Sequence, residues 1–379
     1  MSPPSTDPTA RRTALLVALL TAAAVAWITW PDKPTGPTVP PAPPVAASPP
    51  ALPAPAPSPP VVIAPPPPDV PPVAAPAAPL VAPSDAGAAR TVLRGPWGDG
   101  PGHFGRRAAN EGSPEAPTSL AIDGRGDVAV LDQVNRRVQR FRDGRFVGSL
   151  PLPNEAAQDV AALADGRTAV LDRLGDGTVT LFDAAGRPAR TVPLVGGPIA
   201  EGGAVTGLFA TADGLYAERE HRELVRLTDA RGEPDPARST LWGRPTRDGL
   251  SMLRAAIADR ARGTVTVSAA SRATGAMDWS RTVALGGVVL HLTLLDGDRH
   301  GRAYLGAVVA RERGGALVDP RGVVVRFDRA GVPDGTLELP APPEADELFR
   351  PLAIDDEGRV FALSPGPDGL SLVEYSFPG

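Results

Sequence analysis

Some residues in this sequence have the types and spacing of a cofactor site. Gly100, Gly102 and Gly105 match the glycine spacing of a dinucleotide-binding fingerprint, and acidic Asp123 follows about 20 residues later. That fingerprint requires a long helix after its last glycine, but the Gly-Ser-Pro sequence at 112–114 ends any helix within about two turns. The glycines therefore indicate a loop, and no cofactor is expected.

Possible metal ligands are few. Residues 296–301 resemble a calcium-binding loop, but His300 replaces the third oxygen ligand and Ala307 stands where a bidentate Glu is needed. A hairpin turn explains this segment better. No two histidines lie at a metal-ligand spacing, so no metal site is assigned. The four histidines are His103, His221, His291 and His300.

A cluster of polar residues offers a possible acid-base or anion site. Asp132 places a carboxylate close in sequence to Asn135 and Arg137. Asp172 ends a copy of the same Ala-Val-Leu-Asp tetrapeptide. Because these residues belong to a repeat, we interpret them as structural residues that tie a hairpin to its neighbour. No catalytic residue is assigned, and the Gly-x-Ser-x-Gly elbow of one class of serine hydrolases is absent from the sequence.

Beyond Arg90 the sequence is built from internal repeats. An apolar strand running into an Asp-Gly turn appears six times, at intervals of roughly 40 to 60 residues. Each repeat reads as four antiparallel strands joined by glycine turns. We therefore predict an all-β fold for residues 91–379, a six-bladed β-propeller. The six turns are at residues 123–126, 165–166, 213–214, 259–263, 296–301 and 355–358.

The first repeat resembles a known family. A glycine-rich lead ends in Phe104, a Pro-led apolar strand runs from Pro117 to Asp123, and Asp-x-x-Asn-x-Arg-Val follows at 132–138. This pattern is similar to the NHL repeat. It is partial in the second and last repeats, and only the strand and turn rhythm remains at 205–331. The resemblance implies a propeller in which the strand at 90–94 completes the last blade and closes the ring.

The N-terminal region predicts a membrane anchor. Residues 13–30 are uncharged and apolar, and roughly 18 helical residues span about 27 Å, enough to cross a hydrocarbon core. Arg11 and Arg12 precede this stretch, which favours a cytoplasmic tail at 1–12. We expect a single-pass protein of the inner (plasma) membrane, with its propeller periplasmic or extracellular. A cleaved signal peptide is the alternative, because Ala-Val-Ala at 24–26 resembles a cleavage site.

Residues 31–90 form a Pro/Ala-rich linker. About half of the 47 prolines lie between Pro31 and Pro83. Proline fixes φ and removes the amide donor, so this segment is predicted to be a disordered, extended stalk without helix or sheet. A spacer between the membrane and the propeller is the main interpretation. Its PxxP spacings are also compatible with a ligand for a partner domain.

Three longer segments, 106–117, 242–249 and 311–322, are predicted to be loops that carry arginines. Gathered on one face, these arginines would favour an acidic partner. They are the candidate binding residues Arg106, Arg107, Arg244, Arg247, Arg311, Arg313 and Arg321.

Composition narrows the function. A net charge of -5 leaves no broad basic surface, and 4% aromatic residues leave few stacking platforms, so nucleic acid is not an expected partner. We predict a non-enzymatic protein-binding or scaffold module of the cell envelope, whose partner is an unknown envelope protein. One alternative is a metal-dependent propeller hydrolase or lyase, with Asp132, Asp172 and Glu218 meeting at one end of the central channel. Another is a structural component of an envelope complex.

Overall fold

The computed structural model describes residues 89–108, 114–341 and 348–377. Regular structure in these residues is β-strand, apart from two short 3-10 helices, η1 (Gln133–Asn135) and η2 (Gly202–Ala204). The predicted tail, membrane anchor and linker up to residue 88 lie outside the described residues. Within the described ranges, no helix has the length and apolar character of a membrane span.

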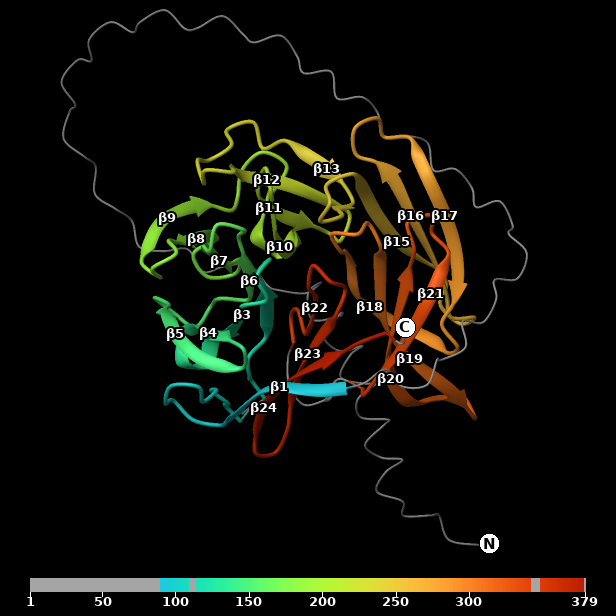
Figure 1. Cartoon of the computed structure of the whole chain (residues 1–379), viewed down its shortest axis with the longest axis horizontal. Helices are drawn as coiled ribbons and strands as arrows, with labels where there is room; N and C mark the ends of the chain where they lie inside the picture. Colours follow the sequence, from blue (N-terminus) through green and yellow to red (C-terminus); the bar gives the residue numbers. More distant parts are fainter. Residues whose placement is uncertain (1–88, 109–113, 342–347, 378–379) are drawn as a thin grey trace, which may run out of the picture. The chain divides into compact units, whose positions relative to one another are not determined.

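The strands form six antiparallel sheets of four strands, which we number as blades 1 to 6 (Figure 1). Blade 1 contains β2 (Ser119–Ile122), β3 (Val128–Asp132), β4 (Arg137–Arg142) and β5 (Arg145–Pro151). Blade 2 contains β6 (Asp159–Ala162), β7 (Thr168–Asp172), β8 (Thr178–Phe182) and β9 (Pro188–Pro193). Blade 3 contains β10 (Val205–Thr211), β11 (Gly214–Arg219), β12 (Glu223–Asp229) and β13 (Thr240–Trp242).

Blade 4 contains β14 (Arg244–Pro245), β15 (Ser251–Asp259), β16 (Thr264–Ser271) and β17 (Met277–Ala284). Blade 5 contains β18 (Val288–Gly297), β19 (Ala303–Arg313), β20 (Ala316–Phe327) and β21 (Pro333–Leu339). Blade 6 contains β22 (Leu352–Ile354), β23 (Val360–Pro365), β24 (Gly369–Tyr375) and β1 (Ala89–Pro96). The first strands of blades 6, 1, 2 and 3 contact one another in turn around the axis, as do those of blades 4, 5 and 6. The six-bladed propeller predicted from the repeats is confirmed.

Strand β1 supplies the outer strand of blade 6. It pairs antiparallel with β24 from Ala89 opposite Tyr375 to Pro96 opposite Gly369. The strand starts at Ala89, two residues before the predicted start of the propeller. Leu93 is buried beside Leu370 and Leu372 of the neighbouring strand. The two ends of the described chain therefore share one sheet.

Aspartates organise the turns between strands. The Asp123 carboxylate accepts hydrogen bonds from the backbone N–H groups of Arg125 and Asp127, both at 2.9 Å. A side-chain oxygen that satisfies two turn amides fixes the local conformation, and the glycine at 126 tolerates its φ of 85°. Asp298 and Asp355 make the equivalent pairs of bonds in blades 5 and 6.

The fourth predicted turn needs a correction. Five of the six Asp-Gly turns join the first and second strands of a blade, but residues 259–263 join the second and third strands of blade 4. The first turn of this blade contains Asp248 and Gly249 instead. The repeat was misplaced because β14 has only two residues, so the sequence carries no recognisable first strand.

The predicted loop at 311–322 is also corrected, because it is a hairpin of two long strands, β19 and β20. Gly314 and Gly315 have φ values of 60° and 78° and make the two-residue turn that positive φ favours. Asp319 has a φ of 50°, and the pairing shifts register between Val309 and Arg311, opposite Pro320. Proline is tolerated in a strand at such an irregularity. The charged residues and the proline concealed the strands.

The apolar core lies between neighbouring blades. Five clusters of buried side chains fill the seams between blades 1 and 2, 2 and 3, 4 and 5, 5 and 6, and 6 and 1. The strands are apolar on both faces for this reason, and all five residues of β3 and of β7 are buried. In the described part of the chain, no such cluster joins blades 3 and 4.

Candidate functional site

A cavity of about 1030 Å³ follows the propeller axis and is lined by the first strands and the segments that connect the blades. Its walls differ in height. The first strands of blades 1 and 2 have four residues each, whereas β15 and β18 have nine and ten. Blades 4 and 5 therefore extend the wall on one side of the cavity, with side chains such as Ile257, Leu290 and Leu317.

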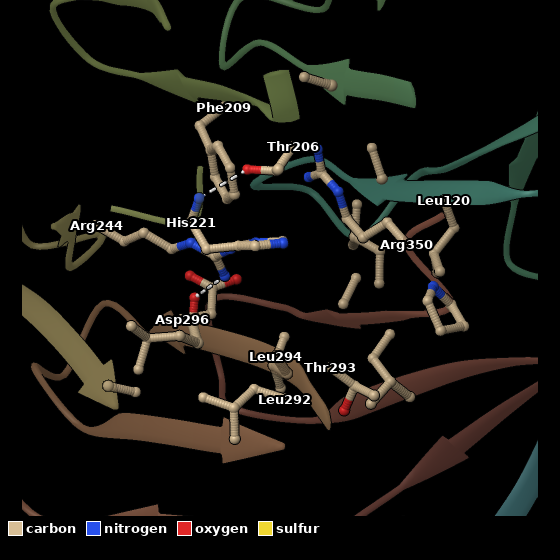
Figure 2. A pocket seen from close by; sticks show the side chains of 18 of the residues that line it. Leu120, Thr206, Phe209, His221, Arg244, Leu292, Thr293, Leu294, Asp296 and Arg350 are labelled. Carbon is tan, nitrogen blue, oxygen red and sulfur yellow. Dashed lines mark hydrogen bonds between the residues drawn. The ribbon is translucent and has the colours of Figure 1, made fainter. Parts of the chain in front are cut away.

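Two guanidinium groups flank an aromatic ring in this cavity. Arg244 and Arg350 lie 4.7 and 4.8 Å from the centre of the Phe209 ring, within the range of cation–π attraction. Figure 2 shows these side chains around the pocket, with Leu292 and Leu294 on another wall. The cavity thus combines apolar surface with positive charge.

Each of these arginines also binds a buried carboxylate. Arg244 donates Nε to Glu218 Oε1 at 2.6 Å and Nη2 to Oε2 at 2.9 Å. Burial would raise the pKa of Glu218, but the charge of Arg244 and hydrogen bonds from His221, Arg244 and Thr206 hold it well below its ordinary value. Glu218 is therefore ionised and a poor general base.

Asp159 is the carboxylate that holds Arg350. It is fully buried and accepts hydrogen bonds from the Ser119 hydroxyl at 2.5 Å and the Leu208 amide at 2.8 Å. Arg350 Nη2 donates to Asp159 and to the Leu208 carbonyl. These contacts join blades 1, 2 and 3 to the connection that precedes blade 6, so Arg350 has a structural role as well as a place in the cavity wall.

Arg247 also lines the cavity, and it lies close to the same segment of β18 as Arg244, whose Nη1 donates to the Leu295 carbonyl at 2.8 Å. Arg247 Nη1 donates to Asp356 Oδ1 at 2.8 Å, and its Nη2 donates to the Ile354 carbonyl and lies 3.8 Å from Asp296 Oδ2. Burial would lower the pKa of Arg247, but Asp296 and Asp356 raise it. Arg247 therefore links blade 4 to blades 5 and 6 by charge.

His221 reaches the cavity from an unusual turn. Glu220 and His221 both have positive φ, 51° and 55°, in the turn between β11 and β12. Such values are uncommon for residues other than glycine. The His221 ring is 71% exposed, with Nδ1 3.4 Å from Glu218 Oε2, and its backbone N–H donates to the Thr206 hydroxyl at 3.0 Å (Figure 2). The turn presents an imidazole to the cavity beside a carboxylate.

The structure does not gather all of the predicted binding arginines. Arg244 and Arg247 line the cavity, and Arg244 lies on β14 instead of in a loop. Arg106 lies over Trp97, and Arg107 pairs with Glu115 and Glu155. The others lie on the β19–β20 hairpin, where Arg311 is 3.9 Å from Asp319, Arg313 is exposed, and Arg321 pairs with Glu338.

The repeat-motif residues bind segments close to their own hairpins. The buried Asp132 accepts hydrogen bonds from the Gly105 amide, Asn135 and Arg137 at 2.9 to 3.0 Å. Arg137 in turn donates to the carbonyls of residues 99, 100 and 103, which ties the hairpin to the glycine-rich lead. Asp172 accepts from the amides of residues 175 and 176 and so fixes a turn.

Asp132, Asp172 and Glu218 do not line the central cavity, although Glu218 contacts Arg244 and His221, which do. They therefore do not meet at one end of the channel. Across the described ranges, no group of three or more His, Asp or Glu side chains is arranged to hold a metal ion.

Sequence reasoning missed Arg350, Phe209 and His221 as cavity residues. Arg350 comes directly before the Pro-led strand of the last repeat, a position that leads into the channel. Phe209 is an aromatic residue on the first strand of blade 3, whereas the first strands of blades 1 and 2 contain no aromatic residue. For His221 the signal was its place in a two-residue turn at the end of a second strand.

Comparisons with known proteins find similarity to solved structures alone. Neither a protein family nor a curated protein matches the sequence. Similar solved structures include a protein of unknown function from Bacteroides caccae, with 15% identity, a TM-score of 0.37, and coverage of 59% of this chain and 81% of that one. A streptogramin B lyase has 10% identity, a TM-score of 0.37, and coverage of 69% and 93%. A catalytically inactive virginiamycin B lyase from Staphylococcus aureus with quinupristin has the same identity and TM-score, with coverage of 69% and 95%.

Proposed function

We propose that this protein is a membrane-anchored, extracytoplasmic β-propeller that binds a partner protein of the cell envelope through its central cavity, without catalysing a reaction. The observation that carries the proposal is the cavity itself. It has a volume of about 1030 Å³, an apolar wall on blades 4 and 5, and several arginines in its lining. This combination fits a ligand with apolar side chains and negative charge.

The state of the acidic groups supports binding over catalysis. Glu218, Asp159 and Asp356 are each engaged by an arginine of the cavity wall. The lowered pKa of Glu218 makes that carboxylate a weak proton acceptor. The three carboxylates hold the arginines in place, so the rigid cationic groups are the features offered to a ligand.

The location is proposed from the N-terminal sequence. Arg11 and Arg12 before the apolar residues 13–30 favour a cytoplasmic N-terminus, which puts the propeller outside. A reporter fused after Gly379 should then be active only outside the cytoplasm, and carbonate should not extract the protein from membranes. Release of a soluble chain that begins near Trp27 would contradict the anchor.

Catalysis in the cavity, as a hydrolase or lyase, is the second candidate. One contact favours it, because His221 lies 3.4 Å from Glu218, and a carboxylate can orient an imidazole for proton transfer. This candidate requires His221 to act on a bound substrate. A His221→Ala variant that keeps full function in the cell would overturn it and leave the binding proposal intact.

Photo-crosslinking in native membranes tests the binding proposal. A photoreactive residue at Leu317, on the cavity wall and 54% exposed, should give a discrete adduct with one partner. The matched control is Leu174, which is 64% exposed and does not line the cavity. Equal adducts from both positions, or none from Leu317, would contradict binding through the cavity.

A further inference from the structure

Blade 4 has an incomplete first strand. Strand β14 pairs with β15 only through Arg244 opposite Leu253 and Pro245 opposite Met252. Strand β15 continues to Asp259 and stays paired with β16 on its other side. Within the described ranges, β15 from Arg254 onward has no partner on the side of β14. Six of the nine residues of this strand, from Arg254 to Asp259, therefore form a free edge.

The direction of the free backbone groups follows from the paired half. The Ser251 carbonyl accepts a hydrogen bond from the Thr246 amide at 2.9 Å, so Ser251 directs its backbone groups toward the β14 side. Alternate residues of a strand point their N–H and C=O groups the same way. Ala255 and Ile257 therefore direct four backbone groups toward the free edge.

This edge faces the central cavity. Ala255 and Ile257 both line the cavity, and on the same side lie apolar residues of blade 5, among them Leu290, Leu292 and Pro320. An unpaired strand edge is a template for another extended chain. Here the template is beside a surface that could take the side chains of that chain.

Arg260 adds a positive charge directly after β15. Its Nη1 donates to the carbonyls of Val289 and Leu290, and within the described residues no carboxylate lies within ion-pair distance of it. The other cavity arginines discussed above are each paired with Asp or Glu. Arg260 also helps to lower the pKa of His291, after the larger effect of burial. A negative group is therefore most favoured at this end of the edge.

We propose that an extended peptide segment of the partner pairs with the free edge of β15 and so completes the first strand of blade 4. The segment carries apolar residues at alternate positions, which pack on the blade 5 wall. It carries a carboxylate, from an acidic side chain or a C-terminus, beside Arg260. This inference rests on the proposed function, since it specifies how the cavity binds a partner.

Strand addition explains the features together. Main-chain hydrogen bonds to Ala255 and Ile257 supply affinity for any extended chain, and alternating side-chain contacts supply specificity. A compact ligand would leave the spaced backbone groups of the edge unpaired. The short β14 is then a functional feature, because a full-length first strand would occupy the same position.

Peptide binding to the full chain tests the proposal. The probe is a fluorescent Thr-Val-Thr-Val-Thr-Val peptide with a free C-terminal carboxylate. We expect saturable binding. Two further peptides carry N-methyl groups, one on the three Thr residues and the other on the three Val residues. The peptide whose methylated amides face β15 should bind at least about tenfold more weakly, because it cannot donate hydrogen bonds to the edge. Equal binding of the unmodified peptide and both N-methylated peptides would overturn strand addition, as would no binding at all.

Protein variants locate the site. Ala255→Pro removes one edge N–H at a position where proline is tolerated in an edge strand, and it should weaken binding by about tenfold. Arg260→Gln should weaken the free-carboxylate peptide but not its C-terminal amide. The matched control is Arg262→Gln, an 86% exposed residue that does not line the cavity. If Ala255→Pro does not fold, the N-methylated peptides still decide the question.

The two proposals can fail separately. If the crosslink from Leu317 persists in Ala255→Pro and the peptides do not bind, the cavity binds its partner in another way and strand addition is wrong. If neither the crosslink nor peptide binding is observed, the proposed function fails as well.

Discussion

The seam between blades 2 and 3 and the seam between blades 3 and 4 are built from different interactions. The first contains 15 buried apolar residues, among them Leu171, Leu181 and Leu215. The second has no comparable apolar cluster among the described residues. Two ion pairs cross it instead, Glu218 with Arg244 and Asp213 with Arg272.

The difference shows that one ring can combine two kinds of stabilisation. Apolar seams depend little on pH and salt, whereas a seam of charges depends on both. The polar seam also lies beside the incomplete first strand and the cavity. Because β14 has only two residues, the inner edge of blade 4 offers few apolar side chains to fill this seam.

The largest effect is expected from opening an apolar seam at the closing strand. A chain that starts at Trp97 lacks β1, which exposes the edge of β24 and removes Leu93 from the seam between blades 6 and 1. Compared with a chain that starts at Ala89, it should lose roughly 3 kcal/mol or more of unfolding free energy. Equal denaturation midpoints for the two chains would show that β1 contributes nothing to the ring.

A single cavity in the apolar seam should have the next largest effect. Leu171→Ala removes a fully buried side chain between blades 2 and 3, at a cost of about 2 to 5 kcal/mol. Urea unfolding at two pH values should show the same loss at both. A loss that changes with pH would mean that this seam also contains a titrating interaction.

The polar seam should respond to pH. Glu218→Gln leaves the buried Arg244 without its carboxylate and should cost about 2 to 4 kcal/mol at pH 7. The pKa of Glu218 is lower in the folded protein than its ordinary value of 4.5, so its contribution is present above pH 4.5 and is lost as pH falls below it. Wild type should therefore lose more stability than the variant on acidification, and parallel pH profiles would contradict this.

The smallest effect is expected at the more exposed pair of the same seam. Arg272→Gln removes an ion pair to Asp213 at 2.7 Å, whose side chains are 25% and 42% exposed. Such pairs contribute about 0.5 to 1 kcal/mol at low salt and less at high salt. A loss that is unchanged in 1 M salt, measured by urea unfolding, would show that Arg272 acts by packing instead of charge.

The sequence predicted the blades where local patterns repeat. Strand ends are marked by short local patterns, namely the Asp-Gly turn at Asp123 and the apolar tetrapeptides that end at Asp132 and Asp172. The six-bladed fold could be predicted because these patterns recur along the chain. The turn of blade 4 was misplaced because β14 is too short to give a sequence signal. The β19–β20 hairpin was predicted to be a loop because its strands contain charged residues and a proline.

The cavity was harder to predict because its contacts are distant in sequence. Arg350 binds Asp159 across 191 positions, and no local pattern links the two. All of the candidate binding residues were arginines in predicted loops. Of these, Arg244 and Arg247 line the cavity, whereas Arg107 and Arg321 do not. Residue type and position in a loop cannot show which side chains converge on the axis.

The pairing of β1 with β24 also determines how the domain carries mechanical load. Any tension transmitted through the chain before Ala89 acts first on this strand. A pull along β1 loads the pairs from Ala89 to Pro96 at the same time, whereas a pull away from the sheet breaks them one after another. The force needed to detach β1 therefore depends on the direction of pulling and is greatest when the pull runs along the strand.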